Sequence, residues 1–217
     1  MDASRAKDTD EDELPMIPAR EALQRLRDGN RRYVEEAHDP GAITNAARRG
    51  ALAEDQQPFA IVLGCSDSRV PPELVFDQGL GELFVVRVAG NIAARSQVGS
   101  IEFAARTFGI RLIVVLGHSR CGAVEAVVDE MRKPSALQSD NLDFVIDRIR
   151  PSVEQAMADG YGHDPGMLVA AVGRQNVRRS KEVLRGSSKI IEQLIDQEGL
   201  MITGAEYSLQ TGVVDFF

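Results

Sequence analysis

The chain has 217 residues, 43% of them hydrophobic, which is enough for one ordinary domain with its own core. A formal net charge of −8 at pH 7 disfavours both nucleic acid and an anionic membrane surface as partners. No apolar run approaches the roughly 20 residues that cross a bilayer, and the acidic start of the chain is the opposite of a secretory signal. We therefore expect a cytoplasmic protein, whose two cysteines are metal ligands or free thiols rather than a disulfide.

The N-terminal part of the chain divides into a tail and a helix. Residues 1–14 are predicted to form a disordered acidic tail, and residues 15–217 a single domain. Apolar residues at helical spacing follow Pro18 and predict a long helix, which Gly29 and Asn30 interrupt. The pattern leaves open whether this helix packs on a partner or on the core of its own chain.

Strand and helix patterns alternate along the rest of the domain. Short apolar, β-branched runs predict strands over residues 59–63, 83–88 and 112–116. Helical patterns are expected over residues 46–53, 97–108, 121–132, 143–158 and 165–197. Ser96 is placed to cap the second of these helices, and residues 200–217 are typical of a hairpin. The fold class we expect is α/β: a mainly parallel β-sheet flanked by helices, with a C-terminal edge hairpin and a long N-terminal helix.

Two of the predicted strands end in the same dipeptide, Leu-Gly, and a soft metal ligand follows each. Cys65 follows Gly64, and His118 and Cys121 follow Gly117. The carboxyl ends of neighbouring parallel strands meet at one edge of a sheet, so we expect these side chains to come within metal-bonding reach. Their spacing is expected to place His118 and Cys121 on one face of a helical turn. Thiolate and imidazole ligands suit Zn²⁺, and three protein ligands leave one tetrahedral position open, as in catalytic sites.

Asp67 and Arg69 follow the first cysteine closely, and the sequence allows two arrangements. Asp67 either closes the fourth zinc position, which gives a resting site, or pairs with Arg69 and accepts a hydrogen bond from a zinc-bound hydroxide. Arginine can hold a carboxylate in a bidentate fork and keep it ionised. An ordinary surface ion pair is the alternative, and the adjacent ligand Cys65 argues against it. The three expected metal ligands also have an alternative interpretation: the two cysteines would be buried free thiols, and His118 a loop histidine whose hydrogen bonds are made within the protein.

Four stretches resemble the β-class carbonic anhydrases, and the resemblance extends over nearly all of the chain beyond the tail. They cover residues 65–71, 81–87, 99–103 and 117–122. The resemblance implies reversible hydration of CO2 to bicarbonate and a proton by zinc-bound hydroxide. It implies that Cys65, His118 and Cys121 hold Zn²⁺. It also implies that Asp67 and Arg69 are the catalytic pair, with Asp67 binding the metal only in a closed state.

The resemblance also implies a substrate pocket and an assembly. The residues that match the CO2 pocket of the family are Gln56, Val70, Phe84, Ala89 and Phe103. Family members form homodimers or dimers of dimers with active sites at subunit interfaces, so Gln56 is expected opposite the zinc of a partner subunit. A bicarbonate-regulated variant of the family has tryptophan at the position of Val62, and this chain has none, which favours the open variant. Phe103 stands where that variant often has tyrosine, so a hydroxyl is missing.

Two alternative functions remain open from the sequence. A hydrolase of COS or CS2 would use the same fold and zinc site, because pocket access and shape decide the substrate. A non-catalytic zinc protein that senses bicarbonate or holds a partner would also keep the metal ligands. The presence of Asp67 and Arg69 beside the ligand set argues against this second alternative.

Overall fold

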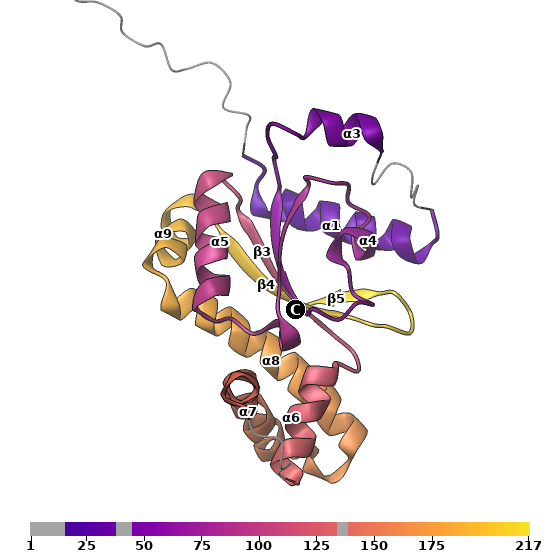
Figure 1. Ribbon diagram of the computed structural model, residues 1–217, viewed down its shortest axis with the longest axis vertical. Helices are drawn as coiled ribbons and strands as arrows, with labels where there is room; N and C mark the ends of the chain where they lie inside the picture. The colour runs from indigo at the N-terminus through magenta and orange to yellow at the C-terminus, as the bar shows by residue number, and fades with distance from the viewer. Residues whose placement is uncertain (1–15, 38–44, 134–138) are drawn as a thin grey trace, which may run out of the picture.

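The computed structural model describes residues 16–37, 45–133 and 139–217, so the predicted acidic tail, residues 1–14, lies outside the described residues. Five strands form one sheet in the order β2-β1-β3-β4-β5 (Figure 1). They are β1 (Ala60–Gly64), β2 (Leu83–Arg87), β3 (Leu112–His118), β4 (Met201–Tyr207) and β5 (Val214–Phe216). Neighbouring strands from β2 to β4 run parallel, and β5 runs antiparallel to β4. The predicted parallel sheet with a C-terminal edge hairpin is confirmed.

Helices flank this sheet, and several of their predicted boundaries differ from those observed. The α-helices are α1 (Ala19–Val34), α3 (Ala46–Ala51), α4 (Pro72–Val75), α5 (Arg95–Thr107), α6 (Gly122–Arg132), α7 (Asp140–Ala158), α8 (Pro165–Ser187) and α9 (Lys189–Glu198), and the 3-10 turns are η1 (Ala89–Asn91) and η2 (Tyr161–His163). The helix predicted over 165–197 is two helices, because Ser188 is extended and its hydroxyl caps α9 by accepting from the Ile191 amide. The cap predicted at Ser96 is absent, because α5 already begins at Arg95.

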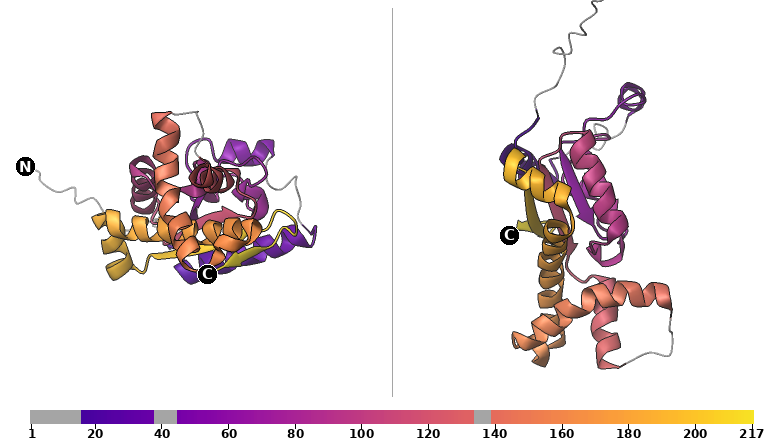
Figure 2. Two further views of the ribbon diagram at one scale, coloured as in Figure 1. Left: turned by 90° about the horizontal axis from the view of Figure 1, so that it is seen from below. Right: turned by 90° about the vertical axis from the view of Figure 1, so that its left-hand side faces the viewer.

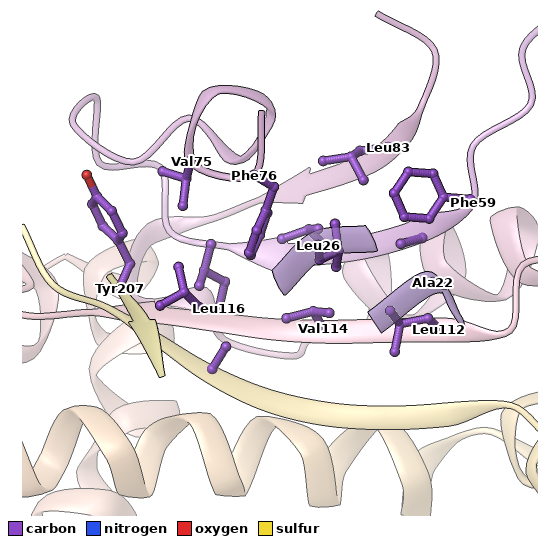
Figure 3. Packing of buried hydrophobic residues seen from close by; sticks show 14 of the residues in the cluster. Ala22, Leu26, Phe59, Val75, Phe76, Leu83, Leu112, Val114, Leu116 and Tyr207 are labelled. Atoms are coloured by element: carbon purple, nitrogen blue, oxygen red, sulfur yellow. The ribbon is translucent and has the colours of Figure 1, made fainter. Parts of the chain in front are cut away.

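Alternate side chains of the central strands point to opposite faces of the sheet, and each face is covered. Val62, Val114 and Leu116 belong to the apolar cluster of Figure 3. In that cluster they pack with Ala22 and Leu26 of α1. The other face packs against α5, α8 and α9 through Ile61, Leu63, Ile113 and Val115. Burial on both faces explains why these strands are continuous apolar runs in the sequence.

A third apolar cluster lies beyond the carboxyl ends of the strands. It joins α6, α7 and the first half of α8, which stand together at one end of the sheet (Figures 1 and 2). Cys65 and Cys121 belong to this cluster, together with Ile92, Ile149 and Leu168. The carboxyl edge of the sheet is therefore covered by helices, which shield the groups placed there from water. None of the helices in the described ranges has the length and apolar character needed to cross a membrane.

The N-terminal helix packs on its own chain, and Gly29 and Asn30 take part in that contact rather than interrupting the helix. The Asn30 amide group donates hydrogen bonds to the carbonyl oxygens of Val75, at 3.0 Å, and Gly212, at 2.9 Å. Its side-chain oxygen accepts a hydrogen bond from the Val214 amide at 2.9 Å. One buried side chain thus joins α1 to α4 and to the β4–β5 hairpin.

We expect Gly29→Ala to destabilise the fold by about 2 kcal/mol or more, because overpacking of this kind requires backbone to move. A Cβ built at Gly29 would lie 1.8 Å from the carbonyl oxygen of Phe76. Gly99→Ala is the matched control, since nothing lies within 4 Å of a Cβ added there in α5. It should be neutral or slightly stabilising. Urea unfolding measures both free energies, and equal values would contradict the close packing of α1.

Candidate metal centre

Three side chains with metal-ligand atoms meet at the carboxyl edge of the sheet. Cys65 directly follows β1, and His118 is the last residue of the neighbouring strand β3. Cys121 is the N-cap residue of α6. The ligand atoms of the three residues all lie within 4.8 Å of one another, and the two sulfur atoms are 3.9 Å apart. The structure thus brings together the three residues that follow the two Leu-Gly strand ends.

The turn between His118 and Cys121 is not the helical turn that the spacing predicted. His118 still belongs to β3, and Arg120 adopts a left-handed backbone with a φ of 53° before α6 begins. Such a φ is uncommon for a residue other than glycine. The tight turn brings a side chain on a strand end and a side chain on a helix cap to the same centre. The two residues therefore converge without sharing a helix face.

The donor set fits a zinc ion. Two sulfurs bound at about 2.3 Å to a tetrahedral zinc ion lie about 3.8 Å apart, close to the observed separation. His118 Nδ1 lies 3.0 Å from the carbonyl oxygen of Ser119, which assigns the proton to Nδ1 and leaves Nε2 as the ligand atom. Nε2 is buried and has no hydrogen-bond partner among the described residues, and a metal ion would satisfy it. Three protein ligands leave one tetrahedral position free.

The electrostatics of the three donors favour a cation. A hydrogen bond from Cys121 lowers the pKa of Cys65 to about 4, against the effect of burial. The same bond, together with burial, raises the pKa of Cys121, so Cys65 loses its proton more readily than Cys121 does. Burial lowers the pKa of His118, but the negative charge of the nearby Cys65 thiolate outweighs burial and raises that pKa. A divalent cation would displace the Cys121 proton and compensate the buried thiolate.

Asp67 and Arg69 form a bidentate pair beside the three donors. Arg69 Nε and Nη2 lie 2.9 and 2.7 Å from the two carboxylate oxygens of Asp67, and the Arg69 amide donates to the same carboxylate at 3.0 Å. These bonds hold the pKa of Asp67 well below its usual range, so the carboxylate is ionised at neutral pH. One of its oxygens lies 3.9 Å from His118 Nε2. Asp67 therefore stands next to the candidate metal position with both oxygens bound to Arg69, as in the open arrangement.

Arg87 holds the loop that carries Cys65 and Asp67, a role that sequence reasoning missed. Arg87 Nε lies 3.0 Å from the carbonyl oxygen of Cys65, and Nη2 lies 2.6 Å from that of Asp67. The two bonds fix the backbone on either side of Ser66. A signal was present in the sequence, because a charged residue ends an otherwise apolar strand at the edge where the ligands gather.

Two of the five residues predicted for the substrate pocket lie near the donors. Val70 is buried, and its amide donates to the carbonyl oxygen of Asp67 at 3.1 Å. Ala89 is the first residue of η1. The next residue, Gly90, donates its N–H to the Cys65 sulfur at 3.4 Å. Both pocket residues therefore belong to segments that contact the metal-ligand loop.

The other three predicted pocket residues lie away from the donors of their own chain. Phe84, near the start of β2, forms an aromatic cluster with Phe103 and Phe108, and its ring centroid lies 6.4 Å from that of Phe103. Gln56 precedes β1 whereas Cys65 follows it, so roughly 15 Å of strand separates them. Gln56 lines a cavity of about 900 Å³ at the amino end of the strand. One chain alone does not assemble the predicted pocket.

The fold and the site together define a class: an α/β protein with a Cys2His donor set where the carboxyl ends of two parallel strands meet. Residues 60–214 match a protein family described as carbonic anhydrase. The chain is 36% identical over 193 residues to carbonic anhydrase 2 of Mycobacterium tuberculosis, which covers 88% of this chain and 89% of that protein. It is 37% identical over 199 residues to a carbonic anhydrase of Mycolicibacterium smegmatis, over 89% of this chain and 91% of that protein.

Solved structures agree with this match at the level of the fold. A β-carbonic anhydrase of Aspergillus fumigatus has a TM-score of 0.70 at 24% identity, over 90% of this chain and 88% of that chain. A tetrameric β-carbonic anhydrase from Sordaria macrospora has a TM-score of 0.71 at 24% identity, over 80% and 87% of the two chains. The chain belongs to the β-class carbonic anhydrase family, as the four sequence stretches predicted.

Proposed function

We propose that the protein is a zinc-dependent carbonic anhydrase, which interconverts CO2 with bicarbonate and a proton. The observation that carries the proposal is the position of the Asp67 carboxylate. Arg69 binds both of its oxygens, and one of these oxygens lies 3.9 Å from Nε2 of His118. Beside it stand three donors that leave one metal position free. Family membership supports the same activity. The zinc ion would acidify a bound water molecule and so supply hydroxide as the nucleophile near neutral pH.

Each residue of the centre has a distinct task in this proposal. Cys65, His118 and Cys121 would hold the zinc ion. Asp67 would accept a hydrogen bond from the attacking oxygen and so direct its lone pair toward the carbon of CO2. Arg69 donates to both carboxylate oxygens, which keeps Asp67 ionised and off the metal.

We also propose that a second copy of the chain completes the CO2 pocket, in a homodimer or a dimer of dimers. Gln56, Phe84 and Phe103 match the family pocket but lie away from the donors of their own chain. Phe103 is 56% exposed, and β2, which carries Phe84, is an edge strand of the described sheet. The β-carbonic anhydrase from Sordaria macrospora is tetrameric. We further propose a cytoplasmic protein, and the net charge of −8 argues against nucleic acid and anionic membrane surfaces as its partners.

We expect the rate of CO2 hydration to rise as pH climbs through and above neutrality. Two thiolate ligands place negative charge on zinc, so bound water should ionise above the value of about 7 reached with three neutral histidines. Asp67 does not set this profile, because its lowered pKa keeps it ionised throughout. Stopped-flow hydration from about pH 6.5 to 9, on protein of known zinc content, makes the measurement. Full activity well below neutral pH would contradict the expectation.

The same assay separates carbonic anhydrase activity from the two alternative functions. Faster turnover of COS or CS2 than of CO2 would identify a hydrolase of sulfur substrates on the same fold. Stoichiometric zinc with no turnover at any pH would identify a non-catalytic zinc protein. Fast CO2 turnover with weaker turnover of COS supports the proposal.

A further inference from the structure

The sulfur of Cys65 receives a hydrogen bond from a neighbouring turn. The backbone N–H of Gly90 in η1 lies 3.4 Å from this sulfur, and both residues are buried. An N–H donor withdraws electron density from a ligand thiolate, and hydrogen bonds to ligand sulfurs tune metal centres. The direction of the Gly90 N–H is therefore a determinant of the chemistry of the proposed centre.

The turn that presents this N–H has a left-handed backbone and is tightly packed. Gly90 and Asn91 both lie in the left-handed region, with φ values of 68° and 44°. A Cβ at Gly90 would lie 2.7 Å from Cδ1 of Ile149, so the turn is pressed against α7. Glycine and asparagine both tolerate this conformation, so the contacts of the turn decide which way its N–H points.

Two buried side chains of α8 fix this turn. Asn176 Nδ2 donates to the carbonyl oxygen of Gly90 at 2.7 Å, and the Ser180 hydroxyl donates to that of Asn91 at 3.0 Å. The two donors are four residues apart, on one face of α8, and are 1% and 3% exposed. Burying two polar side chains costs free energy unless both are paired, and their partners here are successive carbonyls of the same turn.

We propose that Asn176, supported by Ser180, is a positioning residue that aims the Gly90 N–H at the Cys65 sulfur. The helix α8 contributes no metal ligand, but through this contact it sets how strongly the Cys65 thiolate donates electrons to the metal. The inference rests on the proposed zinc centre and adds to it a determinant of metal affinity. Gly90 is held through both peptide groups that flank its Cα: its N–H donates to the Cys65 sulfur, and its carbonyl accepts from Asn176.

The test measures metal binding by the full-length chain, with Zn²⁺ and with Co²⁺ as probes. We expect Asn176→Ala to lower zinc affinity roughly 10-fold in competition with a chromophoric chelator, and Ser180→Ala to lower it less. The thiolate-to-cobalt charge-transfer absorption should shift to longer wavelength in both variants, because a sulfur without its N–H donor holds its electrons less tightly. Ser180→Thr keeps the hydroxyl and should restore both readings.

Ser152→Ala is the matched control for this test. Ser152 on α7 is 2% exposed, and its hydroxyl has no hydrogen-bond partner within the described residues, so affinity and spectrum should stay at the parent values. Parent-like affinity and spectrum in both Asn176→Ala and Ser180→Ala would overturn the positioning role, whatever happens to their stability. If Asn176→Ala does not fold, Ser180→Ala decides alone. A parent chain that binds neither metal would instead overturn the proposed centre.

Discussion

His118→Ala is expected to lose stoichiometric zinc and to hydrate CO2 no faster than the uncatalysed reaction. The variant lacks the one nitrogen donor among the three converging residues of the described chain, which leaves two buried sulfurs. Two thiols do not complete the three-ligand set that a catalytic zinc site requires. Metal content after dialysis against a weak chelator, followed by hydration assays on the same sample, makes the measurement. Cys65→Ala should behave in the same way.

His163→Ala is the control for loss of a histidine. His163 is exposed in η2 and is not one of the three converging donors, so its loss should leave zinc content unchanged. If His118→Ala keeps one zinc per chain, His118 is not a ligand and the assignment of Nε2 to the metal fails.

Asp67→Ala is expected to keep zinc and to lose activity by roughly 10²- to 10⁴-fold, the range typical of a positioned acid–base group. The three converging donors do not include Asp67, so the metal should stay. Without its carboxylate the attacking oxygen loses its acceptor, and the Arg69 guanidinium loses both of its bonds to Asp67. Asp67→Asn should show most of the same loss, because it keeps the shape but removes the charge. The readouts are zinc content and the CO2 hydration rate.

Asp77→Asn is the matched control for the loss of an Asp–Arg pair. Asp77 pairs with Arg32 and has a left-handed backbone, with a φ of 46°, that asparagine adopts readily. It should leave both zinc and activity unchanged. Unchanged hydration in Asp67→Ala would remove Asp67 from the mechanism and leave its pair with Arg69 a surface ion pair.

The sequence predicted the elements that carry the donors because their pattern is local. Each donor segment follows a short apolar strand. The carboxyl ends of parallel strands lie at one edge of the sheet, and this does not depend on where the helices begin and end. The break at Ser188 was missed because an amphipathic pattern runs through it, and only an extended backbone with a side-chain cap reveals it. Gly29 and Asn30 looked like helix breakers, yet they make the contacts of α1 with distant residues. Contacts between segments far apart in sequence have no signature in either segment alone.

The surroundings of the donors were harder to predict than the donors themselves. Arg87 acts on two backbone carbonyls, and Asn176 acts on a third, so neither forms a pattern with a ligand in the sequence. The predicted pocket residues Gln56 and Phe103 lie away from the donors of one chain. Their assignment came from the family resemblance and remains a prediction about a second copy of the chain.

The most direct test of the central claim measures CO2 hydration by stopped flow on one preparation in three states: as isolated, stripped of metal by a chelator, and restored with zinc. Our account predicts turnover that follows zinc content, is lost on stripping and returns with one zinc per chain. Full turnover in the stripped protein, or none in protein with one zinc per chain, would contradict it.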